Sequence, residues 1–247
     1  MYFVATIGIV FCLYTAALSA KLPASWGRCH KSNPEFDECL RTNVEDAIHK
    51  LKNPTPELKL DSFDPLDINE LYIGEGKGAV NLVQHFTNVK LHGLTNAIVK
   101  SFKIDFVKNE IRASSLNPEL RLQGDYDVNG RVLLLPIVGH GPCNVTLLNM
   151  DIDHTLTLET FEKKGKSYLR VKDFKVVMRP EKVIYKFDNL FDGQKDLGDN
   201  VNKVINDNSA EVFEDVRSGY EKSFALIFLD LANRVLPKVP QEDIFLE

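Results

Sequence analysis

The sequence predicts an α+β protein in which a long C-terminal α-helix is wrapped by a highly curved antiparallel β-sheet. Residues 81–186 read almost entirely as strands joined by short turns, which is typical of an antiparallel meander. Residues 200–236 contain no proline and carry a helical pattern. The last part of that helix, "SFALIFLDLANRVL", is apolar on nearly every side, and such a helix has to be surrounded by other elements.

The composition is that of an ordinary globular protein. The chain has 247 residues, of which 44% are hydrophobic and 26% charged, and this length allows one large domain or two small ones. The formal net charge of −5 argues against a nucleic-acid partner, which would need a basic face. The sequence also lacks a polybasic run that would hold an anionic membrane surface.

The first 20 residues, "MYFVATIGIVFCLYTAALSA", contain no charged side chain and end in small residues. They read as a secretory signal peptide without the usual basic start, with possible cleavage after Ser19 or Ala20. The alternative is a membrane anchor, although the run is short for a span of roughly 20 apolar residues. Charges interrupt the C-terminal apolar stretch, so no stable membrane insertion is expected. We therefore expect a secreted, extracellular protein with one domain at residues 21–247.

Three cysteines remain after Cys12 leaves with the signal peptide. Cys29 and Cys39 are expected to form a disulfide in an oxidising compartment, because the Asn33-Pro34 turn between them brings them close. Cys143 is then left over. It is either a buried, unreactive thiol or the site of an intermolecular bridge.

The stretch Asn144-Val145-Thr146 is a sequon for N-glycosylation. A glycan on Asn144 would require this residue to lie on the protein surface.

The first predicted element is an amphipathic helix in "FDECLRTNVEDAIHKLK", which Pro54 and Pro56 end. Its apolar residues recur at helical spacing: Phe36, Leu40, Val44, Ile48 and Leu51. Gly74–Gly78 follows further along the chain. It has neither the glycine spacing nor the Ser or Thr of a phosphate-binding loop, so we expect an ordinary connecting loop.

Alternation of apolar and polar residues marks the strands. Apolar residues alternate with charged ones around Phe102 and Ile104, and the same period recurs from Leu120 to Val128. The dipeptides Asn129-Gly130 and Lys164-Gly165 predict hairpin turns. The resulting sheet has one apolar face and one face of charged and polar residues.

At ~1.5 Å rise per residue the C-terminal helix would extend roughly 50 Å, longer than a compact domain of this mass is wide. A sheet rolled around such a rod cannot match its radius at every level. The interior is then either an elongated hydrophobic tunnel or a core filled by side chains, and the periodicity leaves both possibilities open.

Several stretches resemble the insect takeout and juvenile hormone-binding protein family, part of the tubular lipid-binding proteins. The most specific is "FDNLFDGQKDLGDNVNKVINDNSAEVFEDV", with its spaced asparagines before an acidic helix. "NVKLHGLTNAIVKSFKID", "GDYDVNGRVLLLPIVGHG" and the early cysteine pair also match. The resemblance covers the mature chain. It implies a long helix held in a curved antiparallel sheet, secretion, and binding of a hydrophobic small molecule in an internal tunnel.

One departure concerns the disulfides. The blood carriers of juvenile hormone look to have a second disulfide, and here only Cys143 remains to form one. This places the chain nearer the takeout-like branch, whose ligands vary.

Enzyme and metal sites find little support in the sequence. It contains neither a Gly-x-Ser-x-Gly elbow nor a His-Glu-x-x-His helix, and its 6 histidines show no ligand spacing. Asp151, Asp153 and His154 lie close together, but a strand sends neighbours to opposite faces, and we expect them to be solvated. His140, between two glycines, is expected on the surface. No catalytic residue, cofactor or metal is predicted.

A ligand-binding interior would need an apolar wall and a few polar groups. Tyr126 is expected to offer its hydroxyl to a ligand oxygen. The candidate wall residues are Phe102, Ile104, Phe106, Leu120, Leu122, Leu133, Leu135 and Ile137 from strands, and Phe213, Phe224 and Phe228 from the helix.

Two functions remain open at this point. The first is a secreted, monomeric carrier of a hydrophobic ligand such as a juvenile hormone-like terpenoid, a fatty acid or another lipid. The second is a secreted interaction or signalling protein with a filled core that acts through its surface.

Overall fold

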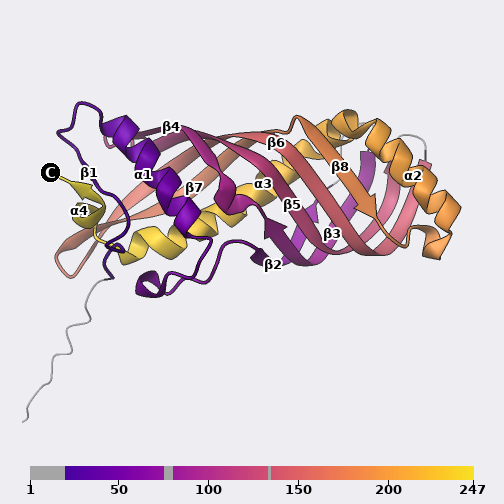
Figure 1. Cartoon of the computed structure of the whole chain (residues 1–247), viewed down its shortest axis with the longest axis horizontal. Helices are drawn as coiled ribbons and strands as arrows, with labels where there is room; N and C mark the ends of the chain where they lie inside the picture. The colour runs from indigo at the N-terminus through magenta and orange to yellow at the C-terminus, as the bar shows by residue number, and fades with distance from the viewer. Residues whose placement is uncertain (1–19, 75–79, 133–134) are drawn as a thin grey trace, which may run out of the picture.

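The structure is a computed structural model that describes residues 20–74, 80–132 and 135–247. It is an elongated body in which long strands wind around one helix (Figure 1). The α-helices are α1 Phe36–Lys50, α2 Lys195–Asp207, α3 Ser209–Val235 and α4 Gln241–Ile244. The strands are β1 Cys29–His30, β2 Leu66–Ile73, β3 Val80–His92, β4 Ile98–Asp105, β5 Glu110–Val132, β6 Leu135–Lys163, β7 Lys166–Arg179, β8 Lys182–Phe187 and β9 Phe245–Leu246.

The large sheet is antiparallel and open, with the strand order β2-β3-β5-β6-β7. Strands β5 and β6 pair along almost their whole length, from Glu110 opposite Thr157 to Val132 opposite Leu135. Each of them has two successive partners on its other side: β3 and β4 pair with β5, and β7 and β8 pair with β6. The sheet therefore reads β4-β5-β6-β7 at the end covered by α1, here the α1 end. It reads β2-β3-β5-β6-β8 at the end covered by α2, here the α2 end.

The predicted α+β architecture is confirmed, and so is the helix that begins at Phe36. The predicted turn at Lys164-Gly165 separates β6 from β7. The turn predicted at Asn129-Gly130 is wrong. Both residues lie inside β5 and pair with Val138 and Ile137 of β6.

The reason is the burial pattern on either side of this dipeptide. Val128 and Val132 are both buried on the inner face, 4% and 3% exposed, so the period of two continues through Asn129 and Gly130. Pairing along β6 outweighs the local preference of Asn-Gly for a turn.

The C-terminal helix is two helices rather than one. Asn208 separates α2 from α3 with φ −115° and ψ 23°, and its side-chain amide donates to the backbone oxygen of Val204 (2.8 Å). Asparagine competes in this way with the helical backbone, and the chain bends here. Helix α2 lies over β8 at the α2 end, while α3 runs along the concave side of the sheet (Figure 1).

The sheet does not surround α3 completely. One stripe of the helix is exposed, with residues four apart: Glu214, Ser218, Lys222, Leu226, Asp230 and Arg234. Leu226 in this stripe is 62% exposed. At any one level the sheet has only four or five strands, and its two edges do not meet. Helix α3 fills the gap between these edges.

Side-chain amides of the helices seal the edge strands on one side of that gap. In each case one asparagine accepts a hydrogen bond from a backbone N–H and donates one to the C=O of the same strand residue. An amide in this position replaces the neighbouring strand that the edge lacks. The pairs are Asn202 with Phe187, Asn206 with Tyr185, and Asn233 with Val171, at donor–acceptor distances of 2.7–2.9 Å.

The opposite edge is sealed by hydroxyl and carboxylate groups of α3. The backbone N–H of Val80 donates to the Asp215 carboxylate, and Ser223 Oγ donates to the backbone oxygen of Tyr72 (2.8 Å). At the α1 end, helix α1 binds the edge of β4: the Val99 N–H donates a hydrogen bond to the Glu45 carboxylate (2.7 Å). The helices thus bind the free backbone groups of strands on both sides of the sheet.

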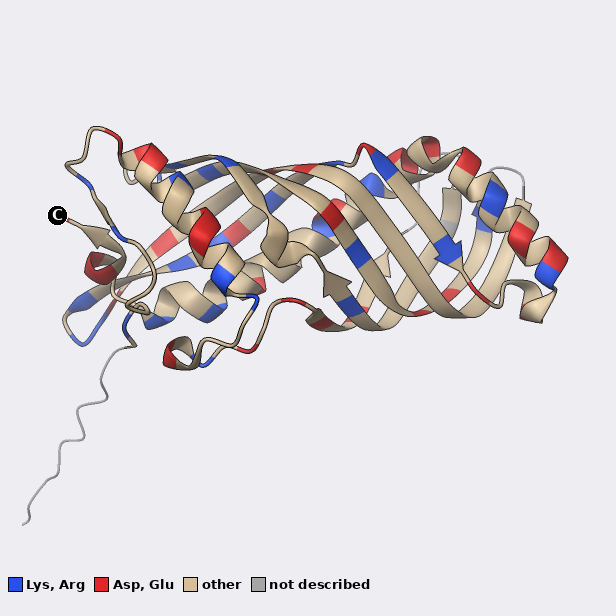
Figure 2. Ribbon diagram, viewed as in Figure 1, with Lys and Arg blue, Asp and Glu red and all other residues tan. Residues whose placement is uncertain are grey.

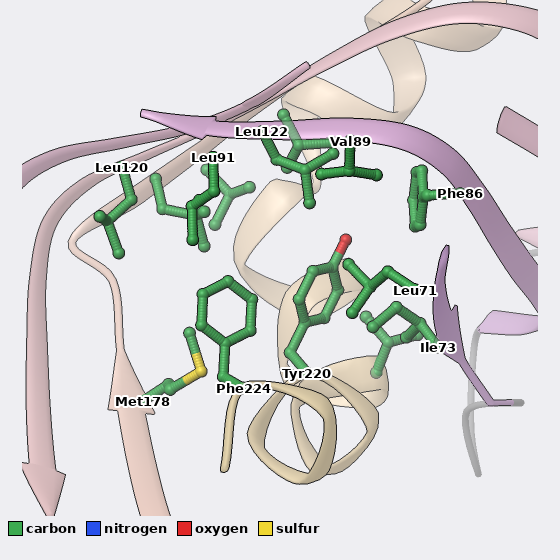
Figure 3. Packing of buried hydrophobic residues seen from close by; sticks show 14 of the residues in the cluster. Leu71, Ile73, Phe86, Val89, Leu91, Leu120, Leu122, Met178, Tyr220 and Phe224 are labelled. Atoms are coloured by element: carbon green, nitrogen blue, oxygen red, sulfur yellow. The ribbon is translucent and has the colours of Figure 1, made fainter. Parts of the chain in front are cut away.

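The interior at the α2 end is filled. Tyr220 and Phe224 of α3, which are 1% and 0% exposed, pack against strand residues such as Phe86 and Leu122 (Figure 3). Met178 closes this cluster next to Phe224 (Figure 3). These side chains therefore block an open channel from one end of the sheet to the other.

The cysteines behave as two different groups. Cys29 and Cys39 form the predicted disulfide, with an S–S distance of 2.01 Å. Cys143 is a buried free thiol on β6, and desolvation raises its pKa to about 12. A thiol buried in this way is the unreactive group that one of the two sequence interpretations expected.

Asn233→Ala tests the sealing of the β7 edge. The substitution leaves the Val171 N–H and C=O without their partners, and we expect it to lower the free energy of unfolding by about 1–3 kcal/mol. Urea unfolding measures this, with Ser218→Ala on the exposed stripe of the same helix as the control. Equal stability of the two variants would contradict the role given to Asn233.

Cys143 should resist thiol reagents in the folded protein, since its thiolate is disfavoured and its side chain is buried. We expect labelling by a disulfide reagent to follow global unfolding in urea. Fast labelling without denaturant would show that the thiol is accessible.

Candidate functional site

A cavity of about 380 Å³ lies at the α1 end, between α1, the concave face of the sheet and the C-terminal half of α3. Its wall is mostly apolar. Helix α1 contributes Leu40, Val44, Ala47 and Ile48, and Leu51 follows directly after it. The strands contribute Val99, Phe102, Ile111, Ala113, Ile152, Leu156 and Phe174, and α3 contributes Phe228, Leu231, Ala232 and Val235.

Small side chains explain why the cavity lies at this end. The residues of β5 on the cavity wall include Ala113 and Ser115, whereas the inner face of the same strand further along carries Leu120 and Leu122. Alanines on the facing helices, among them Ala232, leave further space. Interiors normally pack to a density near ~0.74, so a row of small residues without a compensating large neighbour leaves a void.

A small group of polar side chains interrupts the apolar wall. Ser115 Oγ and His154 Nε2 are 2.9 Å apart, on the neighbouring strands β5 and β6. The Asn117 amide is occupied by the fold, since it donates to the backbone oxygens of Gly93 (3.1 Å) and Leu94 (3.3 Å).

His154 is a half-buried, neutral imidazole in the cavity wall. Its ring contacts Phe174 and Phe228, with centroid distances of 5.9 and 5.8 Å. Burial lowers the pKa of His154 to about 4, because the imidazolium would lose its hydration. At neutral pH the cavity therefore presents an uncharged donor and acceptor rather than a cation.

Two of the predicted wall residues, Phe102 and Phe228, line the cavity. Ile104 packs in the hydrophobic cluster beside it, while Phe106 and Leu135 are each 38% exposed. Leu133 lies outside the described residues. The remaining apolar candidates belong to the buried core, away from the cavity wall: Leu120, Leu122, Ile137, Phe213 and Phe224.

Tyr126 is also part of the filled region. Its hydroxyl donates to the backbone oxygen of Asp188 (2.7 Å) and so joins β5 to the segment after β8. Burial raises the pKa of this phenol. The hydroxyl therefore has a structural partner at the α2 end and does not line the cavity.

Sequence reasoning missed the contribution of α1 and placed His154 wrongly. Asp151 and Asp153 do pair with basic groups on the surface, Lys100 and Arg179. His154, however, lies in the cavity wall. The signal was present in the alternation, because Ile152 and Leu156 on either side of His154 are both buried and share its face of β6. His140 is exposed, as expected.

Among the described residues no group of three or more His, Cys, Asp or Glu side chains is placed to hold a metal ion. None of the described helices is long and apolar enough to cross a membrane. Figure 2 shows acidic and basic residues interspersed along α1 and α2 in that view, without a basic face.

The fold and the cavity define the class: an α+β protein whose open curved sheet and long helix enclose an apolar pocket. The model of the family described as haemolymph juvenile hormone binding protein (JHBP) matches residues 8–246, and the chain belongs to this family. This confirms the resemblance seen in the sequence. The family is described by a binding activity rather than an enzymatic one.

Three known proteins illustrate the relationship. The circadian clock-controlled protein daywake of Drosophila melanogaster is 27% identical over 236 residues, covering 92% of this chain and 89% of that protein. A putative beta-carotene-binding protein of Schistocerca gregaria is 22% identical over 151 residues, 60% of this chain and 59% of that protein. The crystal structure of takeout 1 from Epiphyas postvittana superposes with a TM-score of 0.79 at 24% identity, covering 89% of this chain and 99% of that one, and shows the same fold.

His154 predicts a specific pH dependence of stability. The unfolded imidazole takes up a proton as the pH falls below about 6.5, whereas the folded one does so only near pKa 4. Stability therefore falls with pH in this window, by about 2 kcal/mol between pH 7.5 and pH 5. His154→Phe should remove this part of the slope in urea unfolding, while His140→Phe at the exposed histidine should retain it. Identical slopes in both variants would contradict a neutral His154 in the cavity wall.

Proposed function

We propose that the protein is a secreted carrier that binds one small hydrophobic ligand in the cavity at the α1 end. The observation that supports this most directly is the cavity itself, whose wall is apolar and shaped by small side chains. A mostly apolar cavity of this kind accepts an apolar guest, because the guest restores the dispersion contacts that the wall lacks. Membership of the juvenile hormone binding family supports the same function.

The ligand would be a juvenile hormone-like terpenoid, a fatty acid or another lipid. A volume of about 380 Å³ is near the lower end of the roughly 300–1,000 Å³ found for small-molecule pockets, which favours a single small lipophile. Each buried CH₂ group of such a ligand contributes about 0.8 kcal/mol before ordering costs. Phe102 and Phe228 would contact the ligand from β4 and α3.

The setting of the protein completes the proposal. Residues 1–20 would be a signal peptide, and residues 21–247 one monomeric lipid-binding domain. The disulfide between Cys29 and Cys39 suits an oxidising extracellular compartment. Asn144 lies on β6 between the buried residues Cys143 and Val145, and a glycan on its side-chain nitrogen would lie on the opposite face of the strand, where Asn144 is half-buried with its Oδ1 atom shielded from solvent.

The alternative function, an interaction protein acting through its surface, requires a filled core. The α2 end is filled in this way, but the α1 end is not. The cavity therefore favours the carrier, and we propose no catalytic role or cofactor.

Ala232→Leu tests the carrier function. It adds three carbon atoms to the cavity wall on α3, and we expect the affinity for a fluorescent naphthylamine dye or for its lipid competitors to fall by about ten-fold or more. Ser218→Leu, at an exposed position of the same helix away from the cavity, is the matched control. Unchanged binding in Ala232→Leu would contradict binding in this cavity, provided that thermal unfolding shows both variants to be folded.

Native mass spectrometry of the wild type should show a bound lipid that organic extraction removes.

A further inference from the structure

We infer that the cavity selects an uncharged lipophile that carries one hydrogen-bonding group, such as an ester, ketone or alcohol, and that His154 and Ser115 bind this group. The inference rests on the proposed carrier function and specifies the ligand of the same cavity.

The two side chains form one polar spot in an apolar wall. In the register of β5 and β6, His154 lies opposite Ala113, and Ser115 lies opposite Ile152. The two polar residues are therefore diagonal neighbours on one face, close enough for the 2.9 Å contact between His154 Nε2 and Ser115 Oγ. Both residues line the cavity.

This pair keeps spare hydrogen-bonding capacity. Within the described ranges, the second ring nitrogen of His154 (Nδ1) and the rest of the Ser115 hydroxyl have no protein partner. If Nε2–H donates to Ser115, the serine O–H is free to donate and Nδ1 is free to accept. If the serine O–H donates to Nε2, Nδ1–H becomes the free donor and the serine oxygen the free acceptor. Either arrangement offers a ligand one donor and one acceptor.

The surroundings hold the pair in place and shield it from bulk solvent on several sides. Phe174 and Phe228 contact the imidazole ring from two other elements, β7 and α3. Ser115 is 6% exposed. A polar ligand group that enters such a spot gains a hydrogen bond in an apolar environment, whereas a hydrocarbon leaves the remaining donor and acceptor of the pair unused.

Charge decides against an anionic head group at this position. Among the cavity-lining residues that the structure describes, Arg28 carries a formal charge, and it is exposed. A carboxylate beside His154 would be buried between two phenylalanines, without a cation among the side chains that contact the imidazole ring. An uncharged ester or alcohol avoids this cost.

Four probes with the same carbon chain separate these effects: tetradecane, tetradecanol, methyl tetradecanoate and tetradecanoate. Each competes with the fluorescent naphthylamine dye at about pH 7.5. In the wild type we expect the alcohol and the ester to bind about five- to ten-fold more tightly than the hydrocarbon and the carboxylate, the value of one net hydrogen bond.

Variants assign the preference to the two residues. His154→Phe keeps an aromatic ring between Phe174 and Phe228 but loses both nitrogens, so the alcohol and the ester should fall to the level of the hydrocarbon while the hydrocarbon is unchanged. Ser115→Ala should act in the same direction and tests the pair independently if His154→Phe fails to fold. His140→Phe should leave all four affinities unchanged.

The outcomes distinguish this inference from the carrier function. Equal binding of all four probes, or tighter binding of tetradecanoate, would overturn the inference and leave the carrier function standing. A preference for the alcohol and the ester that survives in His154→Phe and Ser115→Ala would overturn the assignment to these residues. If neither the dye nor any probe binds the wild type, the carrier function fails and the inference fails with it.

Discussion

The structure depends on the pairing of helix side chains with the free backbone groups of the sheet edges. An open sheet exposes rows of unpaired N–H and C=O groups, and leaving them buried without partners would cost several hydrogen bonds. Three asparagines, Asn202, Asn206 and Asn233, each bind both the N–H and the C=O of one strand residue, as a neighbouring strand would. On the other side, Asp215 and Ser223 bind β3 and β2. The barrel-like body is thus closed by a helix instead of by strand pairing.

This closure fixes α3 along the axis of the sheet and leaves the size of the side chains to decide what the interior contains. Tyr220 and Phe224 of α3 pack against leucines and Phe86 of the strands, and the core is filled there. Where α3 presents Ala232 and β5 presents Ala113, the same framework leaves a cavity. One architecture therefore provides stability at one end and a pocket at the other, without a break in the sheet.

The pocket is chemically simple, and this simplicity limits what the protein does. Its wall is apolar, its polar spot is the neutral pair of His154 and Ser115, and Asn117 is engaged with the backbone. Such a site can hold and orient a small lipophile. Ser115 Oγ lies within hydrogen-bond reach of His154 Nε2 (2.9 Å), but among the described residues no side chain binds the second ring nitrogen of His154, as the third group of a catalytic triad would.

The sequence by itself determined the features that depend on local pattern. The period of two identified the strands, the period of about four identified α1, and the spacing of Cys29 and Cys39 identified the disulfide. The spaced asparagines were visible in the sequence, but their role as partners of strand edges was not. Only the tertiary structure decided that Asn129-Gly130 continues β5, that Asn208 divides the C-terminal helix, and that His154 faces the pocket. Each of these outcomes depends on a partner distant in sequence or on burial by another element, and a local pattern carries no information about either.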